Sequence, residues 1–314
     1  MRARLSFVVA LFSSSLASAQ PAAPDDPSAK TVSPAEGQSS ERPGAARAVG
    51  GAGEIRSPNA PQPEDEPELD ALTFHRANYF ITGFTRDTQV KFQFSIKYDL
   101  WPSKGHHTVY FAYTQRSLWD LFSRSSPFRE SNYAPELFYA HYHSEVHGEP
   151  GPGCGLFSEQ AGIAHESNGE ASDSSRSWNR LFVDVAAACN SKHVYGLVEL
   201  RVWYPLGVSD NESITQTQGY GELGLAVGFD DVAAHTNGLV SLALRKGANF
   251  DLAKGSVTLD VRWRPTYQRL FGESWKLAPY VWFQLFTGYG ETLGSYDRAQ
   301  TSLRVGIGFT DRSR

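Results

Sequence analysis

The sequence has few cysteines, no long apolar run and no excess of basic residues. It contains only 2 cysteines, and it has no apolar run of the roughly eighteen residues that a membrane-spanning helix needs. A net charge of −5 leaves no basic surface of the kind that binds nucleic acid, so we expect no nucleic-acid partner. The Gly-x-Ser-x-Gly elbow of the α/β-hydrolases is also absent. These absences exclude a helical membrane protein and argue against a water-soluble serine esterase.

Residues 1–19 have the pattern of a secretory signal peptide. Arg2 and Arg4 precede an apolar stretch from Leu5 to Leu16, and the small residues 17–19 follow it. A membrane-spanning helix is the alternative, but serines interrupt this stretch and it is too short to cross a bilayer. We therefore expect the protein to be exported.

Residues 20–70 have no aromatic side chain and hold 9 of the 17 prolines. Such a composition cannot bury a core, so we expect a disordered tail rich in proline and alanine. The acidic run at 64–68 is expected to be solvated within it. The folded domain is expected over residues 71–314, after this tail.

Alternation of apolar and polar side chains dominates the folded part, most clearly over residues 90–100. Val90, Phe92 and Phe94 begin an apolar row, while Lys91 and Gln93 begin the polar row between them. This period of two predicts strands with two different faces. In a water-soluble barrel the aromatic residues would form the core, whereas in a membrane barrel the apolar row meets lipid and the polar row faces the lumen.

The length and the even number of such segments favour a transmembrane barrel. We expect an all-β, twelve-stranded antiparallel transmembrane β-barrel, with strands near residues 74–84, 90–100, 106–116, 134–146, 156–167, 176–188, 193–204, 216–229, 236–246, 254–265, 277–288 and 300–309.

One predicted hairpin carries residues that suggest nucleophilic catalysis. His165 and Ser167 lie two residues apart on one strand, so they share a face about 7 Å apart along the backbone. Asn179 comes opposite His165 if the chain returns directly. A serine nucleophile, a histidine base and a group that orients the imidazole would then meet. The alternative is that these are ordinary lumen and loop residues at a strand end.

The alternation indicates which face the three residues occupy. Asn179, Leu181 and Val183 are alternate residues of one predicted strand, and His165 and Ile163 are alternate residues of the other. Alternate residues face the same side, so His165 and Asn179 fall in the apolar rows. Polar groups on the outer wall of a barrel are costly without a purpose. We therefore expect an active site on the barrel exterior, open directly to lipid.

The sequence resembles the outer membrane phospholipase A family of Gram-negative bacteria over roughly residues 74–309. The blocks His165–Gly169 and Ser175–Arg180 are similar to the family signature His-x-Ser-Asn-Gly followed by Ser-Arg-Ser-Trp-Asn-Arg. Residues 114–117, 125–133, 288–293 and 304–308 resemble further blocks of the family. The resemblance implies an outer membrane homodimer that hydrolyses acyl esters of glycerophospholipids and requires Ca²⁺.

Several site residues are implied by this resemblance. It makes Ser167 the nucleophile, His165 the base and Asn179 the residue that orients His165, with the loop amides near Gly169 facing the oxyanion. The calcium ligands would be the Glu170 carbonyl, the Ser175 hydroxyl and the hydroxyl of Ser125 from the partner subunit. Gln115, which falls in an apolar row, would lie in the dimer interface. The alternative for Gln115 is a strand end outside the hydrocarbon.

A non-catalytic outer membrane barrel, either a pore or a scaffold, is the second hypothesis. It explains the alternation but leaves the spacing of His165, Ser167 and Asn179 as a coincidence.

The two cysteines fall at one end of the same hairpin. If His165 faces Asn179, the numbers of paired residues on the two strands sum to 344. Those of Cys154 and Cys189 sum to 343, so the two cysteines would be neighbours, and an oxidising compartment favours a disulfide between them. Simple alternation opposes it, because it places Cys154 in the lumen row and Cys189 in the outward row. The sequence leaves this pairing open.

Overall fold

The structure is a computed structural model of the 314-residue chain. It describes residues 72–83, 89–101, 106–121, 128–143, 153–191, 193–208, 211, 213–229, 237–248, 251, 253–265 and 279–309. Contacts divide the chain into two units, Met1–Gln62 and Pro63–Arg314, and all described residues belong to the second. The predicted signal peptide and the predicted tail over residues 20–70 therefore lie outside the described residues.

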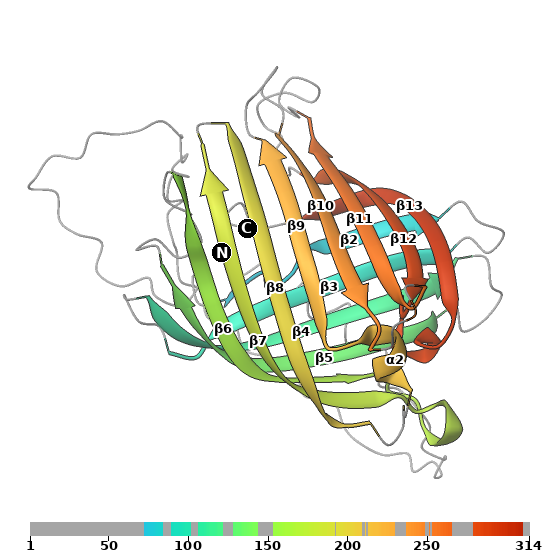
Figure 1. Ribbon diagram of the computed structural model, residues 1–314. Helices are drawn as coiled ribbons and strands as arrows, with labels where there is room; N and C mark the ends of the chain where they lie inside the picture. Colours follow the sequence, from blue (N-terminus) through green and yellow to red (C-terminus); the bar gives the residue numbers. More distant parts are fainter. Residues whose placement is uncertain are drawn as a thin grey trace, which may run out of the picture. The chain divides into compact units, whose positions relative to one another are not determined.

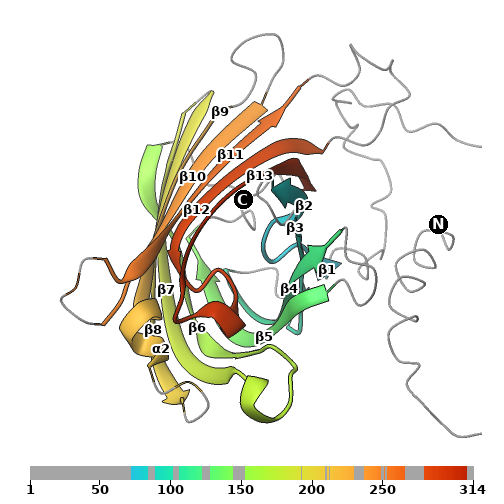
Figure 2. The same cartoon turned by 90° about the vertical axis from the view of Figure 1, so that its right-hand side faces the viewer.

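Twelve strands follow one another around a closed antiparallel barrel (Figures 1 and 2). They are β2 (Asn78–Gly83), β3 (Gln89–Asp99), β4 (His107–Asp120), β5 (Phe128–Tyr142), β6 (Gly153–Ser167), β7 (Ser177–Asn190), β8 (Val194–Gly207), β9 (Gly221–Phe229), β10 (Asn237–Lys246), β11 (Gly255–Arg264), β12 (Tyr280–Tyr289) and β13 (Ala299–Phe309). The ring closes because β2 pairs with both β13 and β3, and the short β1 (Leu72–Thr73) extends the sheet beside β3. This confirms the predicted fold class.

The two faces of the strands separate as the alternation predicts. Lys91 and Lys97 are buried in the lumen, whereas Tyr98 is exposed on the outer wall. The outer wall is apolar from strand to strand, as at Ile163, which is 49% exposed. Among the described residues, no helix is long and apolar enough to cross a membrane.

The lumen is more apolar than the sequence indicates. Tyr110, Phe138 and Phe182 belong to a buried cluster, and the Lys97 ammonium lies 3.8 Å from the Tyr110 ring centroid. The alternation assigns a residue to a face but does not require the lumen face to be polar. Aromatic side chains fill this lumen together with cations, so it is a packed interior.

Buried ion pairs complete the packing of the lumen. Glu136 accepts hydrogen bonds from Arg201 at 2.6 Å and from Arg76 at 3.3 Å. Glu291, in the loop after β12, pairs with Lys91 at 3.2 Å and with Arg304. Burial alone would raise the pKa of Glu291, but these two cations outweigh it and hold the pKa at about 2. The carboxylate therefore stays ionised where the loop contacts the lumen.

Two strand starts differ from the predicted ones by five residues or more, those of β9 and β5. Residues 216–218, predicted to begin a strand, belong to the helix α2 (Ile214–Gln218), which ends where the Gly219 N–H bonds to the Thr215 carbonyl at 2.9 Å. Ile214 is fully buried in the lumen cluster, so tertiary packing decides the conformation of this polar stretch. β5 begins at Phe128, six residues before the predicted start at residue 134.

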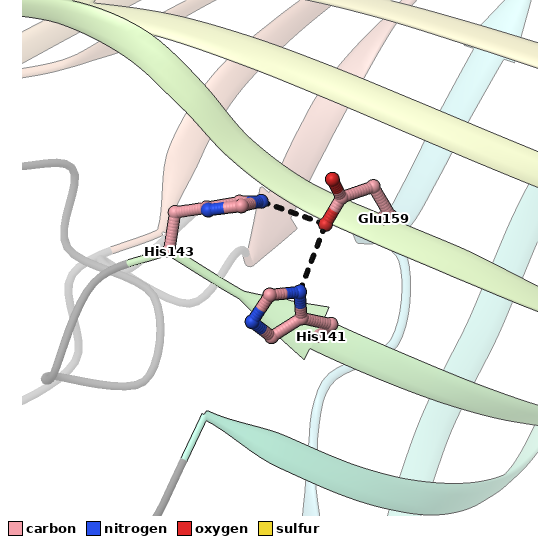
Figure 3. A group of neighbouring side chains, drawn as sticks. All are labelled: His141, His143 and Glu159. Atoms are coloured by element: carbon pink, nitrogen blue, oxygen red, sulfur yellow. Dashed lines mark hydrogen bonds and ion pairs between the residues drawn. The ribbon is translucent and has the colours of Figure 1, made fainter.

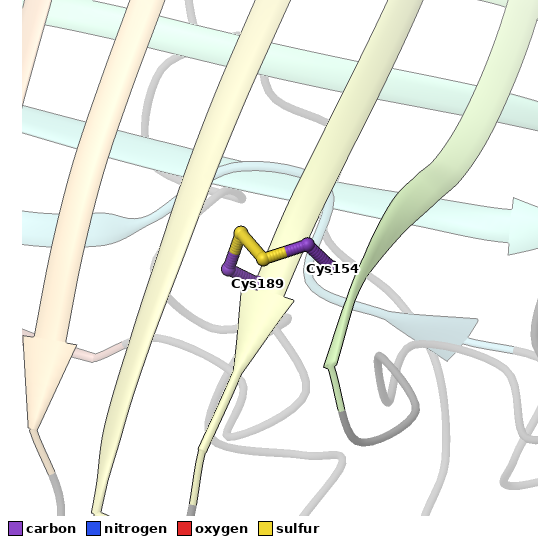
Figure 4. The surroundings of a disulfide bond; sticks show 2 residues. All are labelled: Cys154 and Cys189. Atoms are coloured by element: carbon purple, nitrogen blue, oxygen red, sulfur yellow. A yellow bond between two sulfur atoms is a disulfide. The ribbon is translucent and has the colours of Figure 1, made fainter.

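The two cysteines form a disulfide across β6 and β7 (Figure 4). Cys154 pairs directly with Cys189 in the strand register, and both face outward. A β-bulge between Leu156 and Ser158 inserts Phe157 as one extra residue in β6, which reverses the faces of the residues before it. Simple alternation therefore assigns Cys154 to the wrong face.

Candidate active site on the outer wall

The β6–β7 hairpin brings an imidazole and a carboxamide into contact. His165 lies opposite Asn179 in the register, and His165 Nδ1 is 2.8 Å from Asn179 Oδ1. Because an amide oxygen only accepts hydrogen bonds, Nδ1 carries the proton of the neutral ring. The lone pair then resides on Nε2, which is the nitrogen that a general base uses.

Ser167 lies two residues beyond His165, at the end of the same strand. Its Oγ accepts a hydrogen bond from the Gly169 N–H at 3.1 Å. Within the described part of the chain, no hydrogen bond joins the His165 ring to Ser167. Catalytic hydrogen bonds are often long in ligand-free enzymes and tighten around substrate.

These side chains lie on the outer wall of the barrel. The next outward residues on the two strands, Ile163 and Leu181, are 49% and 46% exposed, and Asn179 is itself exposed. The structure thus places the three polar groups at the edge of an apolar surface, which is the position that the alternation predicts.

A buried network supports the hairpin from the lumen side. Arg180 donates to Glu166 Oε2 at 2.9 Å, and the Trp178 indole N–H donates to the same oxygen at 3.1 Å. The Arg180 guanidinium also lies 4.1 Å from the Trp178 ring centroid. Since these residues alternate with His165 and Asn179, they fix the backbone that carries the outward pair.

Asn168 organises the loop between β6 and β7, a role that the sequence analysis missed. Its Oδ1 accepts from the N–H groups of Glu170 at 3.2 Å and Arg176 at 2.9 Å, and its Nδ2 donates to the Ser174 carbonyl at 2.8 Å. The buried side chain therefore connects both ends of the loop. The signal in the sequence is the Asn-Gly pair, which is typical of turns.

Gly169 has two reasons to be glycine. Its φ is +69°, in the left-handed region, and a Cβ would lie 2.8 Å from Cε2 of Tyr133. The left-handed backbone directs the Gly169 N–H at Ser167 Oγ, and the close approach of Tyr133 leaves no room for a Cβ. An N–H beside a serine hydroxyl would be suited to face the oxyanion that forms if this serine attacks an ester.

The loop also holds two of the three predicted calcium ligands. Within the described residues, neither the Glu170 carbonyl oxygen nor the Ser175 hydroxyl takes part in a hydrogen bond, so both remain available as ligands. Neutral oxygens fit a hard cation such as Ca²⁺, although they bind it more weakly than carboxylates do. The third predicted ligand, Ser125, lies outside the described residues.

Gln115 lies in the outward row of β4, where the sequence places it. Its Oε1 accepts from the Tyr113 hydroxyl at 3.2 Å, and its Nε2 donates to Ser117 Oγ at 3.3 Å. Long contacts of this kind satisfy the amide only in part. An amide has two N–H donors and two acceptor lone pairs, so part of its capacity is unused by these two contacts.

Two sequence blocks that resemble the family meet at the same end of the barrel. Asn132 Oδ1 accepts from the Leu293 N–H at 3.0 Å, and Glu130 Oε1 accepts from the Gly294 N–H at 2.6 Å. Asn132 also donates to Glu130 at 2.7 Å. These contacts join β5 to the short helix η2 (Leu293–Ser295). The residues of the two blocks therefore hold these elements together.

The fold and this site define a β-barrel membrane protein with a serine, a histidine and an asparagine on its outer wall. A profile of the family described as Phospholipase A1 matches residues 62–310. Phospholipase A1 of Proteus vulgaris is 33% identical over 230 residues, which cover 71% of this chain and 70% of the relative. Phospholipase A1 of Escherichia coli K12 is 32% identical over 242 residues, 75% of this chain and 74% of the relative.

Two solved structures are similar in fold as well. The outer membrane phospholipase A from Escherichia coli superposes with a TM-score of 0.61 at 28% identity, covering 79% of this chain and 95% of that one. A Salmonella typhi outer membrane phospholipase, described as a dimer with bound calcium, gives a TM-score of 0.60 at 28% identity, with 79% and 95% covered. The chain therefore belongs to the phospholipase A1 family. It is an outer membrane β-barrel and a carboxylic ester hydrolase.

Proposed function

We propose that this protein hydrolyses acyl ester bonds of membrane glycerophospholipids with a Ser-His-Asn triad, as a dimer that depends on Ca²⁺. The observation that carries the proposal is the His165–Asn179 hydrogen bond of 2.8 Å, with Ser167 beside it on the outer wall. A membrane phospholipid could reach this site without leaving the bilayer.

In the proposed reaction His165 Nε2 takes the proton of Ser167 while Oγ attacks the ester carbonyl carbon. The resulting oxyanion would accept a hydrogen bond from the Gly169 N–H. Collapse of the tetrahedral intermediate would leave the acyl group on Ser167 and release the glycerol-side alcohol, which takes the proton from His165. Water activated by the same imidazole would then release the fatty acid. Asn179 carries no charge, so it orients the ring without stabilising the imidazolium as an aspartate would.

Calcium would be held by the Glu170 carbonyl, Ser175 and Ser125 of the partner subunit. When bound, it would supply positive charge near the oxyanion. A ligand set shared between two subunits makes complete binding depend on assembly, which would couple dimerisation to activity. The dimeric, calcium-bound Salmonella typhi structure supports this part of the proposal.

The experiment that tests the activity is release of fatty acid from phospholipid in mixed detergent micelles by the refolded chain with millimolar calcium. We expect multiple turnovers per protein molecule. If the folded, dimeric protein releases no fatty acid under these conditions, the non-catalytic barrel becomes the better interpretation.

Replacing Gln115 by leucine should weaken dimerisation. Among the described residues the amide has only long contacts, and hydrogen bonds between polar groups in membranes contribute about 0.6 to 2 kcal/mol. We expect the dimer dissociation constant to rise by roughly 3-fold to 30-fold, measured by sedimentation equilibrium in detergent with calcium. Thr287→Leu, at an outward position of β12, is the matched control. An unchanged dissociation constant for Gln115→Leu would remove this residue from the interface.

A further inference from the structure

We propose a second metal site, for Zn²⁺ or a similar first-row divalent cation, formed by His141, His143 and Glu159. His141 Nδ1 lies 3.1 Å from Glu159 Oε2, and His143 Nε2 lies 2.7 Å from the same oxygen. One ligand atom from each residue lies within 4.8 Å of the others. Figure 3 shows the imidazoles of His141, in β5, and His143, just after β5, pointing toward the Glu159 carboxylate on β6.

The strand register builds this cluster. Glu159 lies directly opposite His141, and His143 follows two residues on, so it emerges on the same face. The His143 N–H bonds to the carbonyl of Phe157 at 2.9 Å, which holds His143 beyond the end of β5. Phe157 is the extra residue of the bulge in β6. The same bulge therefore places the disulfide and supports the position of His143.

The cluster lies on the outer wall, where an isolated carboxylate is costly. The side chains of His141, His143 and Glu159 are 32%, 35% and 39% exposed, and their neighbours Leu137 and Tyr139 are exposed apolar and aromatic residues. Two imidazole N–H groups now share one carboxylate oxygen. Because neutral imidazole can move its proton between its two nitrogens, both facing nitrogens can instead present lone pairs to a cation.

The donor set indicates the class of metal. Two imidazoles and one carboxylate match zinc sites that keep a fourth position open, and they suit first-row metals in general. Ca²⁺ prefers oxygen ligands only, so this cluster is a poor calcium site. The partial exposure of all three side chains leaves room for water as a further ligand.

Neighbouring histidines orient the cluster. The His107 ring stacks on His141 with centroids 4.4 Å apart and planes 14° apart, and His107 Nδ1 bonds to the Tyr139 hydroxyl. His106 Nδ1 bonds to the Tyr142 carbonyl at 2.9 Å. The stacked His107 ring limits rotation of the His141 imidazole, which is a ligand of the proposed site.

This site is separate from the triad. Glu159 and His165 lie six residues apart on β6, which corresponds to about 20 Å along the strand. A bound metal would join β5 to β6 near the end where the disulfide joins β6 to β7. Together the two links would hold the far end of the hairpin that carries His165 and Asn179.

The test uses the full chain refolded in detergent, stripped of metal with a chelator and dialysed. Co²⁺ serves as the optical probe and Zn²⁺ as the competitor, with millimolar Ca²⁺ present throughout to occupy oxygen sites. We expect one Co²⁺ per chain with a visible absorption band, displaced by one Zn²⁺. The double variant His141→Gln/His143→Gln should lose this affinity by at least about 100-fold, and Glu159→Gln should weaken it less.

His193→Gln, which removes a histidine from the β7–β8 turn, is the matched control and should bind like the wild type. The thermal unfolding midpoint with and without Zn²⁺ gives a second readout, because a metal that binds only the folded state raises it. Equal Zn²⁺ affinity in the double variant and the wild type would overturn the proposal. So would an equal loss of affinity in His193→Gln. Neither result depends on whether the protein hydrolyses phospholipid.

Discussion

Replacing Ser167 by alanine should lower the turnover of phospholipid by at least about 10⁴-fold and leave the barrel folded. The hydroxyl is the proposed nucleophile, and removing it leaves only the oxyanion donors and substrate binding to accelerate hydrolysis. Stability should change little, because Ser167 is only partly buried and its Oγ has one hydrogen bond, from the Gly169 N–H at 3.1 Å. Titration of released fatty acid measures the effect.

Thr301→Ala is the control for this variant, since it removes an exposed hydroxyl from the outer wall at β13. It should retain wild-type turnover. A Ser167→Ala protein that keeps more than about one hundredth of the wild-type rate would show that another group attacks the ester.

Removing calcium should have the second largest effect. With excess chelator we expect turnover to fall by at least about 10²-fold to 10³-fold, the range typical for losing one oxyanion stabiliser. The proposed ligands in the loop after β6, the Glu170 carbonyl and the Ser175 hydroxyl, are neutral oxygens that would bind the cation weakly, so a chelator should remove it readily. The barrel should stay folded, because Glu170 and Ser175 lie in the loop between β6 and β7 and not in a paired strand.

Adding calcium back should restore turnover, and magnesium should do so poorly because it demands a compact octahedral shell. Ser175→Ala should need a higher calcium concentration for half-maximal activity. Full activity in excess chelator would remove the metal from the mechanism.

The alternation in the sequence was sufficient to predict the barrel and the outward face of the hairpin. The sequence pairs His165 with Asn179 only if the chain returns directly, and the register shows this pairing although a loop over residues 168–176 separates the two strands. The rule fails at Cys154, since a bulge inserts a residue that no residue type in the sequence marks. Local register can be read from sequence, but a local irregularity in a strand cannot.

Other features depend on contacts between distant parts of the chain. Asn168 resembles an ordinary turn residue until its bonds to Arg176 and Ser174 appear. Glu159 stands as an unexplained acidic residue in an outward row of the sequence, and only the β5–β6 register shows that two histidines face it. The helix α2 likewise forms because Ile214 is drawn into the lumen cluster, which no local pattern indicates.

In the proposed mechanism the outer wall of this barrel carries a serine activated by the neighbouring imidazole. The most direct measurement is covalent labelling with a sulfonyl fluoride that carries a long alkyl chain, in the presence of calcium, followed by peptide mapping by mass spectrometry. We predict modification at Ser167 alone, and much slower modification of that residue in His165→Gln. Labelling at a different residue, or equal labelling of Ser167 in both proteins, would contradict this account.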